Sequence, residues 1–329
     1  MTDTTTTAIP QATYASGGRP PSGPVALLGP QTDYTEIRQV LDELEVTGTV
    51  ALITTGWQEN EREDDALVTQ IARPTHNLAL HARSETVYSE DPAYAAAAAA
   101  RQQRLRLMQQ FYRIRLDAID DAARAIGVRH VDREFQDEQL ATSVAQFQHI
   151  DALHLEQCQA TWRSFEAAWP AHERPALMRQ REEVAQLIAE ASAIVISGGH
   201  IGSLLNRLRL FDVMSNLGAT PIVAWSAGAM ALTDRIILAH DTPPFGKNIA
   251  QVLDVGLGLA PSIVVLPDPQ HRVQADDHDG IARFAQRMAP RRCLGMNPGA
   301  QLIFQSRALV SGVADLLSKD GSIIEGWRP

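Results

Sequence analysis

The sequence predicts an α/β protein in which helices flank a mostly parallel sheet and an all-helical insertion interrupts the chain. Two observations predict it. Short apolar runs alternate with helical patterns in the first and last parts of the chain, whereas residues 85–190 show helical periodicity alone. We therefore expect a disordered tail over 1–24, a first part of the α/β domain over 25–84, the helical insertion over 85–190, and a second part of the α/β domain over 191–329.

The composition is that of an ordinary globular chain without a basic face. Its 329 residues are 45% hydrophobic and 21% charged, which is enough to bury a substantial core. The formal charge of −10 argues against nucleic-acid and membrane-surface binding, because both usually need a basic face. No apolar run approaches the ~18 residues of a membrane span, and the Thr- and Pro-rich tail lacks the apolar run of a signal peptide. We expect a cytoplasmic protein with no nucleic-acid or membrane partner.

The two cysteines predict neither a disulfide framework nor a metal site. Cys158 and Cys293 lie far apart in the sequence, which fits a reducing compartment, and we expect both to be packed thiols. The chain has no HExxH motif, no paired cysteines and no acidic calcium loop. The sequence therefore predicts no metal and no other cofactor.

The first part of the chain predicts a strand, a helix and a second strand. The apolar run Val25-Ala26-Leu27-Leu28-Gly29 precedes a helical pattern from Ile37 to Leu44, and Val50-Ala51-Leu52-Ile53-Thr54 follows. Two apolar strands joined by a helix are typical of a parallel sheet. The acidic run ENEREDD, 59–65, predicts a solvated loop or a helix start.

The insertion predicts three helices. The first ends near Gly127, which stands where a C-cap would, and its apolar residues recur at spacings of three and four: Leu105, Met108, Tyr112, Leu116, Ile119, Ala123 and Ile126. The second carries Leu140, Val144, Phe147, Ile150, Trp162, Phe165 and Trp169 before Pro170 stops it, and the third covers about 174–190. We interpret the insertion as an element for packing or for a homodimer, because amphipathic stripes are usually core; the alternative is a lid over the site.

The last part of the chain repeats the alternation of strand and helix. Ala193–Ile196 is followed by the helical GSLLNRLRLFDVM and then by Ile222–Trp225. Further strands are predicted at Ile236–Leu238, Ile263–Leu266 and Leu302–Phe304.

One strand ends on a serine between small residues, in PIVAWSAGAMAL, 221–232. A sharp turn from strand to helix lifts a serine Oγ out of the sheet, and the helix N-terminus offers free N–H groups to an oxyanion. Ser226 is thus a candidate nucleophile, although Ala224 replaces the glycine usual two residues earlier. The alternative is that Ala227-Gly228 merely lets strand and helix pack closely.

The residues around Ser226 resemble a known family. WSAGAM, the Gly-Gly strand end Ser197-Gly198-Gly199-His200, the SLLNRL helix and the later LGMNPGAQLIF are similar to the serine peptidase family of aspartyl dipeptidase (peptidase E) and cyanophycinase. The resemblance covers 193–310 well and 25–58 weakly, and leaves out the helical insertion. It implies the class I glutamine amidotransferase-like fold.

The resemblance also implies a set of site residues. Ser226 matches the nucleophile and His271 the general base, and Asp241, fifteen residues after the serine, matches the triad acid of aspartyl dipeptidase. His271 would take the proton of Ser226 while Asp241 holds the imidazole tautomer. The backbone N–H groups of Gly199 and Ala227 would form the oxyanion hole. The neighbouring residues expected at the substrate are Gly198, His200, Gln270 and Arg272.

Several of these residues have other interpretations. Asp241 precedes Thr242-Pro243-Pro244 and fits a simple turn. His240 and His278 compete with His271 as the base, and a surface histidine is the plain alternative. His200 either contacts substrate or starts a helix.

The surroundings of His271 depart from cyanophycinase. In HRVQADDHDGIARF, Arg272 is adjacent but Arg283 is distant and three aspartates intervene, which argues against cyanophycin as the substrate. Asn297-Pro298 replaces an acid of that family, which favours Asp241.

The sequence therefore predicts a serine hydrolase that cleaves a small peptide or isopeptide bond, with an aspartyl substrate as one candidate, and acyl transfer stays open. The alternative is a non-catalytic protein that binds a ligand or partner. A glutaminase is disfavoured because that chemistry uses a cysteine at the elbow.

Overall fold

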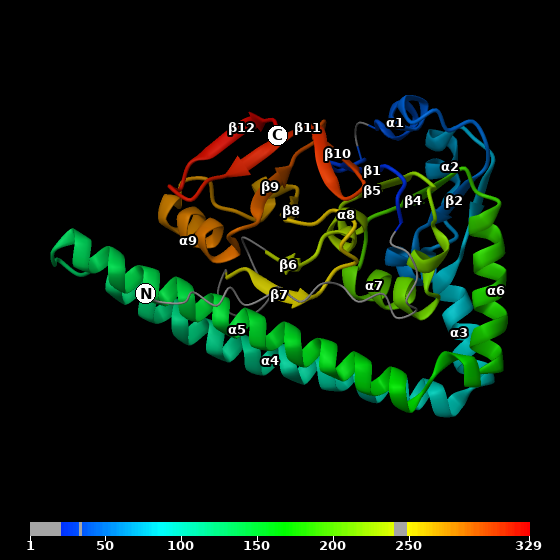
Figure 1. Ribbon diagram of the computed structural model, residues 1–329, viewed down its shortest axis with the longest axis horizontal. Coiled ribbons are helices and arrows are strands. Elements are labelled where there is room, and N and C mark those ends of the chain that lie inside the picture. Colours follow the sequence, from blue (N-terminus) through cyan, green and yellow to red (C-terminus); the bar gives the residue numbers. More distant parts are fainter. Residues whose placement is uncertain (1–20, 33–34, 240–248) are drawn as a thin grey trace.

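The computed structural model describes residues 21–32, 35–239 and 249–329 (Figure 1). Residues 1–20 of the predicted tail and Asp241 lie outside the described residues. The last residues of that predicted tail are packed: Ser22 N donates to Gly218 O at 2.8 Å, and Gly23 lies against the backbone of Ala219. In the described parts of the chain, no helix is long and apolar enough to cross a membrane.

The protein has an α/β fold built on a mixed, mostly parallel sheet. Five parallel strands stand in the order β3-β2-β4-β5-β1, and β10, β11, β9 and β8 continue the sheet. The bounds of the parallel strands are β1 Val25–Leu28, β2 Val50–Ile53, β3 Thr75–Asn77, β4 Ala193–Ile196 and β5 Ile222–Trp225. Every residue of β1, β2, β4 and β5 is buried, because helices cover both faces of such a sheet. These strands match the apolar runs of the sequence.

The other strands were only partly predicted. They are β6 Ile236–Leu238, β7 Gln251–Asp254, β8 Ile263–Pro267, β9 Arg292–Met296, β10 Gln301–Gln305, β11 Ala308–Leu317 and β12 Ile323–Trp327. β6 and β7 form a separate hairpin-like pair, and β12 pairs with β11. β3, β7, β11 and β12 were not predicted, because edge and half-exposed strands lack a continuous apolar run. β9 is buried except at Arg292, but RCLGM has no continuous apolar run, and only its end was covered, by the string LGMNPGAQLIF of the family resemblance.

Helices flank the sheet and extend far beyond it (Figure 1). The α-helices are α1 Ile37–Glu43, α2 Asp65–Ile71, α3 Leu80–Glu90, α4 Pro92–Gly127, α5 Arg133–Ala168, α6 Pro175–Ala189, α7 Ile201–Leu210, α8 Ala227–Leu232 and α9 His278–Met288. Short 3-10 segments are η1 Thr55–Asn60, η2 Ala171–Glu173, η3 Val213–Asn216 and η4 Pro269–His271.

The acidic run 59–65 is only partly solvated. Glu59, Glu63 and Asp65 are exposed, but Glu61 is 2% exposed. Its carboxylate accepts hydrogen bonds from the backbone N–H groups of His81 and Ala82, at 2.9 and 2.6 Å. Glu61 therefore caps the N-terminus of α3, a contact across twenty residues that the local sequence does not reveal.

α4 and α5 form an antiparallel hairpin of two 36-residue helices. The Asp132 side chain caps α5, and the Gln136 amide donates to the carbonyls of Ile126, Gly127 and Arg129 at the turn. Gly127 is the last helical residue and Val128 the C-cap, one position later than predicted. Figure 1 shows the hairpin along the outside of the α/β domain, where α5 packs on β7 and α9.

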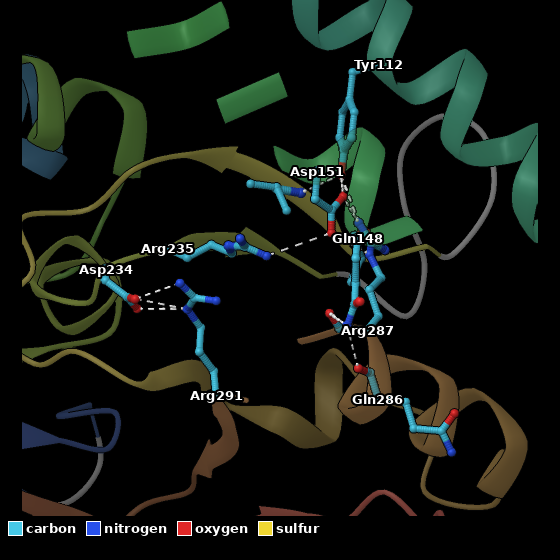
Figure 2. Close-up of polar contacts among 10 residues, drawn as sticks. Tyr112, Gln148, Asp151, Asp234, Arg235, Gln286, Arg287 and Arg291 are labelled. Atoms are coloured by element: carbon cyan, nitrogen blue, oxygen red, sulfur yellow. Dashed lines mark hydrogen bonds and ion pairs between the residues drawn. The ribbon is translucent and has the colours of Figure 1, made fainter. Parts of the chain in front are cut away.

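A buried charged cluster joins the hairpin to the α/β domain (Figure 2). Arg287 of α9 donates to both oxygens of Asp151 on α5, at 2.7 and 2.8 Å, and to the Tyr112 hydroxyl of α4 at 2.8 Å. Tyr112 donates in turn to Asp151 at 2.7 Å. Burial raises the pKa of Tyr112, so the hydroxyl keeps its proton. Three helices are thus held by one set of mutually satisfied polar groups.

We expect Arg287→Met to lower the free energy of unfolding by about 3 kcal/mol, because it leaves the fully buried Asp151 carboxylate without its main partner. The control is Arg133→Met, which breaks an exposed pair with Asp137 and should cost less than about 0.5 kcal/mol. Urea unfolding followed by circular dichroism measures both. Equal effects of the two variants would contradict the role given to the cluster.

Candidate active site

Ser226 lies at a sharp turn between β5 and α8. Its backbone has φ 50° and ψ −122°, a conformation that costs a non-glycine residue on the order of 1–3 kcal/mol. Trp225 is the last residue of β5, and Ala227 begins α8. The turn directs the serine side chain out of the carboxyl edge of the sheet, where ligands bind in open α/β sheets.

The end of β4 approaches this turn without room for side chains. A Cβ on Gly198 would lie 2.8 Å from Ser226 Cβ, and a Cβ on Gly228 would collide with the Ile196 carbonyl oxygen. Small residues around the serine therefore do allow close packing, as the alternative interpretation held. The same packing places the Gly198 backbone against the Ser226 side chain.

Two backbone N–H groups beside Ser226 are available to a ligand. Gly199 has φ +111°, and a Cβ there would lie 2.5 Å from the Gly56 backbone, so only glycine fits. Within the described residues, neither Gly199 N–H nor Ala227 N–H donates to a protein acceptor, whereas the next amide, His200 N–H, donates to Gly56 O at 2.7 Å. This arrangement can receive an oxyanion.

His200 caps α7. Its Nδ1 accepts from Ser203 N at 3.0 Å and lies 3.0 Å from Ser203 Oγ, so the helix-start interpretation holds while the ring stays exposed. Gln58, in η1 after β2, donates to Ser203 Oγ at 2.7 Å.

Gln58 was not predicted as a site residue from the sequence. Its backbone has φ 58° and ψ −121°, close to the conformation of Ser226, and it lies on the loop whose Gly56 touches Gly199. A second strained residue so near the first is typical of a functional site. Gly56 after a strand was the available signal, but a lone glycine is a weak one.

The long strand β11 extends beyond the carboxyl ends of the parallel strands. It pairs first with β10, from Ala308 to Val313, and then with β9, from Asp315 to Leu317. β10 begins opposite Leu28, so the second half of β11 lies beyond the end of β1. β9 and β8 consequently run back toward that edge, and the Asn297 carbonyl after β9 contacts Gly29 after β1.

His271 therefore lies on a loop at the same edge as Ser226. Asp268 N, which precedes η4, donates to Met296 O at 3.1 Å, and Leu28 pairs with Trp225 across β1 and β5. The His271 side chain is 71% exposed, and its Nε2 lies 3.8 Å from Asp268 Oδ2. Within the described residues, no hydrogen bond joins His271 to Ser226.

The other predicted site residues on this loop bind protein atoms. The Gln270 amide donates to Asp268 Oδ1 at 2.9 Å. The Arg272 guanidinium donates to the carbonyls of Pro267 and Ala239, the latter at 2.9 Å. These contacts shape the loop. Asp268, which the sequence analysis did not single out, accepts from Gln270 and faces His271.

The competing histidines differ. His278 is the first residue of α9, and its Nδ1 lies 3.0 Å from Gly321 O. His240, like Asp241, lies outside the described residues. Asn297 donates to Asp315 Oδ2 at 2.5 Å.

No group of three or more His, Cys, Asp or Glu side chains within the described ranges is arranged to hold a metal.

No family model matches the chain, and no curated protein matches its sequence. Among solved structures, the chain is similar to one described as the crystal structure of a peptidase from an acI-B1 Actinobacterium. The two are 12% identical, the match covers 93% of this chain and 92% of that chain, and the TM-score is 0.39. Likeness at this level carries no argument about catalysis or substrate.

We expect Gly199→Ala to destabilise the protein more than Gly218→Ala. Both glycines have positive φ, but only Gly199 also abuts backbone, and nothing lies within 4 Å of a Cβ at Gly218. Gly218→Ala should cost about 1 kcal/mol and Gly199→Ala at least about 2 kcal/mol. Chemical denaturation of the two variants tests the difference, and a smaller cost at Gly199 would contradict the close approach to Gly56.

We expect both thiols to be unreactive in the folded protein. Burial raises the pKa of Cys293 to about 12 and that of Cys158 still further from its ordinary range. Because the folded pKa is raised, the unfolded thiols ionise first, and this contribution to stability is lost as the pH rises from about 8.5 toward 12. Titration with a disulfide reagent at pH 8 should detect two thiols in denaturant and none rapidly in buffer.

Proposed function

We propose that the protein is a serine hydrolase that cleaves a small peptide or isopeptide bond through an acyl-enzyme at Ser226. The observation that carries this proposal is the strained turn at Ser226, together with the unengaged N–H groups of Gly199 and Ala227 beside it. A backbone held at a cost of this kind is expected where it presents a reacting atom.

The proposed reaction follows from these groups. Ser226 Oγ attacks the carbonyl carbon and its proton passes to His271, while the two N–H groups bind the developing oxyanion. Collapse of the tetrahedral intermediate breaks the carbon–nitrogen bond, and His271 returns the proton to the leaving amine. Water then cleaves the acyl-enzyme by the same sequence of steps, which releases the acid and restores Ser226.

Two carboxylates are candidates to orient His271. Asp241 is implied by the family resemblance, and Asp268 lies 3.8 Å from His271 Nε2. A carboxylate on one ring nitrogen leaves the other free to accept the serine proton. The exposed His271 ring has room to turn toward Ser226 when substrate covers the edge of the sheet.

The substrate class rests on the resemblance around Ser226 and His271. It favours dipeptides or isopeptides, with aspartyl substrates first among them. Asp276, Asp277 and Asp279 follow His271 where cyanophycinase has arginines, so cyanophycin itself is not proposed.

We expect Ser226→Ala to abolish labelling by a fluorophosphonate probe and to lower hydrolysis by at least about 10³-fold. The substrates are α-aspartyl, β-aspartyl and neutral dipeptides, assayed by release of free amino acids. The control is Ser311→Ala, which removes an exposed hydroxyl from β11 and should leave both signals unchanged. Labelling of Ser226→Ala at the wild-type rate would overturn the assignment of the nucleophile.

The exposed His271, without a hydrogen bond to Ser226, favours a second candidate: a ligand-binding protein without catalysis. If the protein only binds a ligand, neither the wild type nor Ser226→Ala should hydrolyse any dipeptide of the panel. A dipeptide of the panel should instead raise the melting temperature of both proteins equally.

A further inference from the structure

The outer face of α4 carries an apolar stripe that the hairpin does not use. Leu107, Phe111 and Ile114 are 43%, 59% and 64% exposed, although they are among the largest apolar side chains of the helix. They lie on the face opposite Tyr112 and Leu116, which are buried against α5 and the α/β domain. The charged cluster of Figure 2 fixes which face is buried, so the stripe stays outside.

The stripe continues as a regular seam. Its positions are three and four residues apart, and all are exposed: Ala100, Arg104, Leu107, Phe111, Ile114, Ala118, Asp121, Ala125 and Val128. We call this set the α4 seam. A repeat of alternating three and four is that of a and d positions in a coiled coil, sustained here for about four heptads. A helix face that only meets water does not need this spacing.

We infer that the α4 seam is the interface of a homodimer in which the α4 helices of two copies pack antiparallel about a two-fold axis between Phe111 and Ile114. A second copy is the occupant because the seam is complementary to itself. The inference is independent of the function proposed for Ser226.

The central layers fit together by volume. With the axis between Phe111 and Ile114, each Phe111 meets Ile114 of the second copy, and each Leu107 meets Ala118. A large side chain thus faces a small one in the outer layers, as close packing of a and d positions requires. Beyond them, Ala100 meets Ala125, which lets the helices approach closely.

The charges of the seam also complement each other. In the same register Arg104 of one copy faces Asp121 of the other, and the two-fold axis makes this pair twice. The residues directly before four of the seam positions also avoid repulsion. Gln110 faces Asp117 and Gln103 faces Arg124, so that a neutral amide lies opposite each charge. A parallel pairing would instead place Arg104 on Arg104 and Asp121 on Asp121, which is repulsive.

The first test is the mass of the full chain in solution. We expect sedimentation equilibrium at micromolar concentration to give twice the 36.0 kDa of the chain. Phe111→Glu should weaken dimerisation by about 100-fold or more, because it removes one buried aromatic from each copy and buries a charge. The control is Val310→Glu, which alters a 52% exposed apolar side chain on β11 and should leave the dimer unchanged.

The second test is the register. Arg104→Asp and Asp121→Arg should each weaken the dimer by about tenfold, and the double variant should restore it, because each reversed pair is again of opposite sign. With Leu107→Cys and Ala118→Cys, a disulfide between copies should form when the two variants are mixed and not with either alone. The native thiols are buried and do not interfere.

A monomer at up to about 100 µM, or a dimer that Phe111→Glu leaves intact, overturns the inference. So does Leu107→Cys forming a disulfide with itself, since that is the result of a parallel pairing. The substituted side chains are exposed in the single chain, so far-ultraviolet circular dichroism should be unchanged, which separates loss of the dimer from loss of the fold.

Discussion

The close approach of backbone to backbone at the carboxyl edge of the sheet is the constraint on which the candidate site depends. Gly56, Gly198, Gly199 and Gly228 lie where a Cβ would collide with a neighbouring main chain or with Ser226. Because no side chain separates these segments, the strand ends hold one another in place, and the strained turns at Ser226 and Gln58 can persist. The free N–H groups of the site are a consequence of this packing.

A different interaction governs the insertion. Local periodicity already predicts the face of α4 that carries Tyr112 and Leu116 as the apolar one, and the buried Arg287–Asp151 pair with Tyr112 holds that face against α5 and α9. Burying an ion pair costs desolvation, so such a pair specifies an arrangement more than it stabilises one. Its effect here is to leave the α4 seam exposed on the opposite face of the helix. The proposed dimer interface therefore belongs to α4 of the insertion, whereas the candidate site is formed by the ends of β4 and β5 and the loops that follow them.

Much of the fold could be predicted from the sequence, because buried strands and amphipathic helices show as patterns of residues close together in the chain. The four buried strands of the parallel core appear as apolar runs, and the three helices of the insertion appear as repeats of three and four. Around the site, the serine between small residues and the Gly-Gly strand end could be recognised from the residues alone. The contacts of Gln270 and Arg272 could not, because their partners are carbonyl and carboxylate groups set by the path of the loop.

The sequence by itself determined where strands and helices form and which serine follows a buried strand, because these depend on residues close together in the chain. Only the tertiary structure decided the rest. The length of β11 brings the loop of His271 to the edge where Ser226 lies, and the contact of Gly56 with Gly199 places the segment that carries Gln58 beside the end of β4. On α4 the sequence carries two apolar stripes, one through Tyr112 and Leu116 and one through Phe111 and Ile114. The stripe through Tyr112 and Leu116 is the one that periodicity predicted and that the structure buries, whereas its polar partners Asp151 and Arg287 are brought to it only by the tertiary structure.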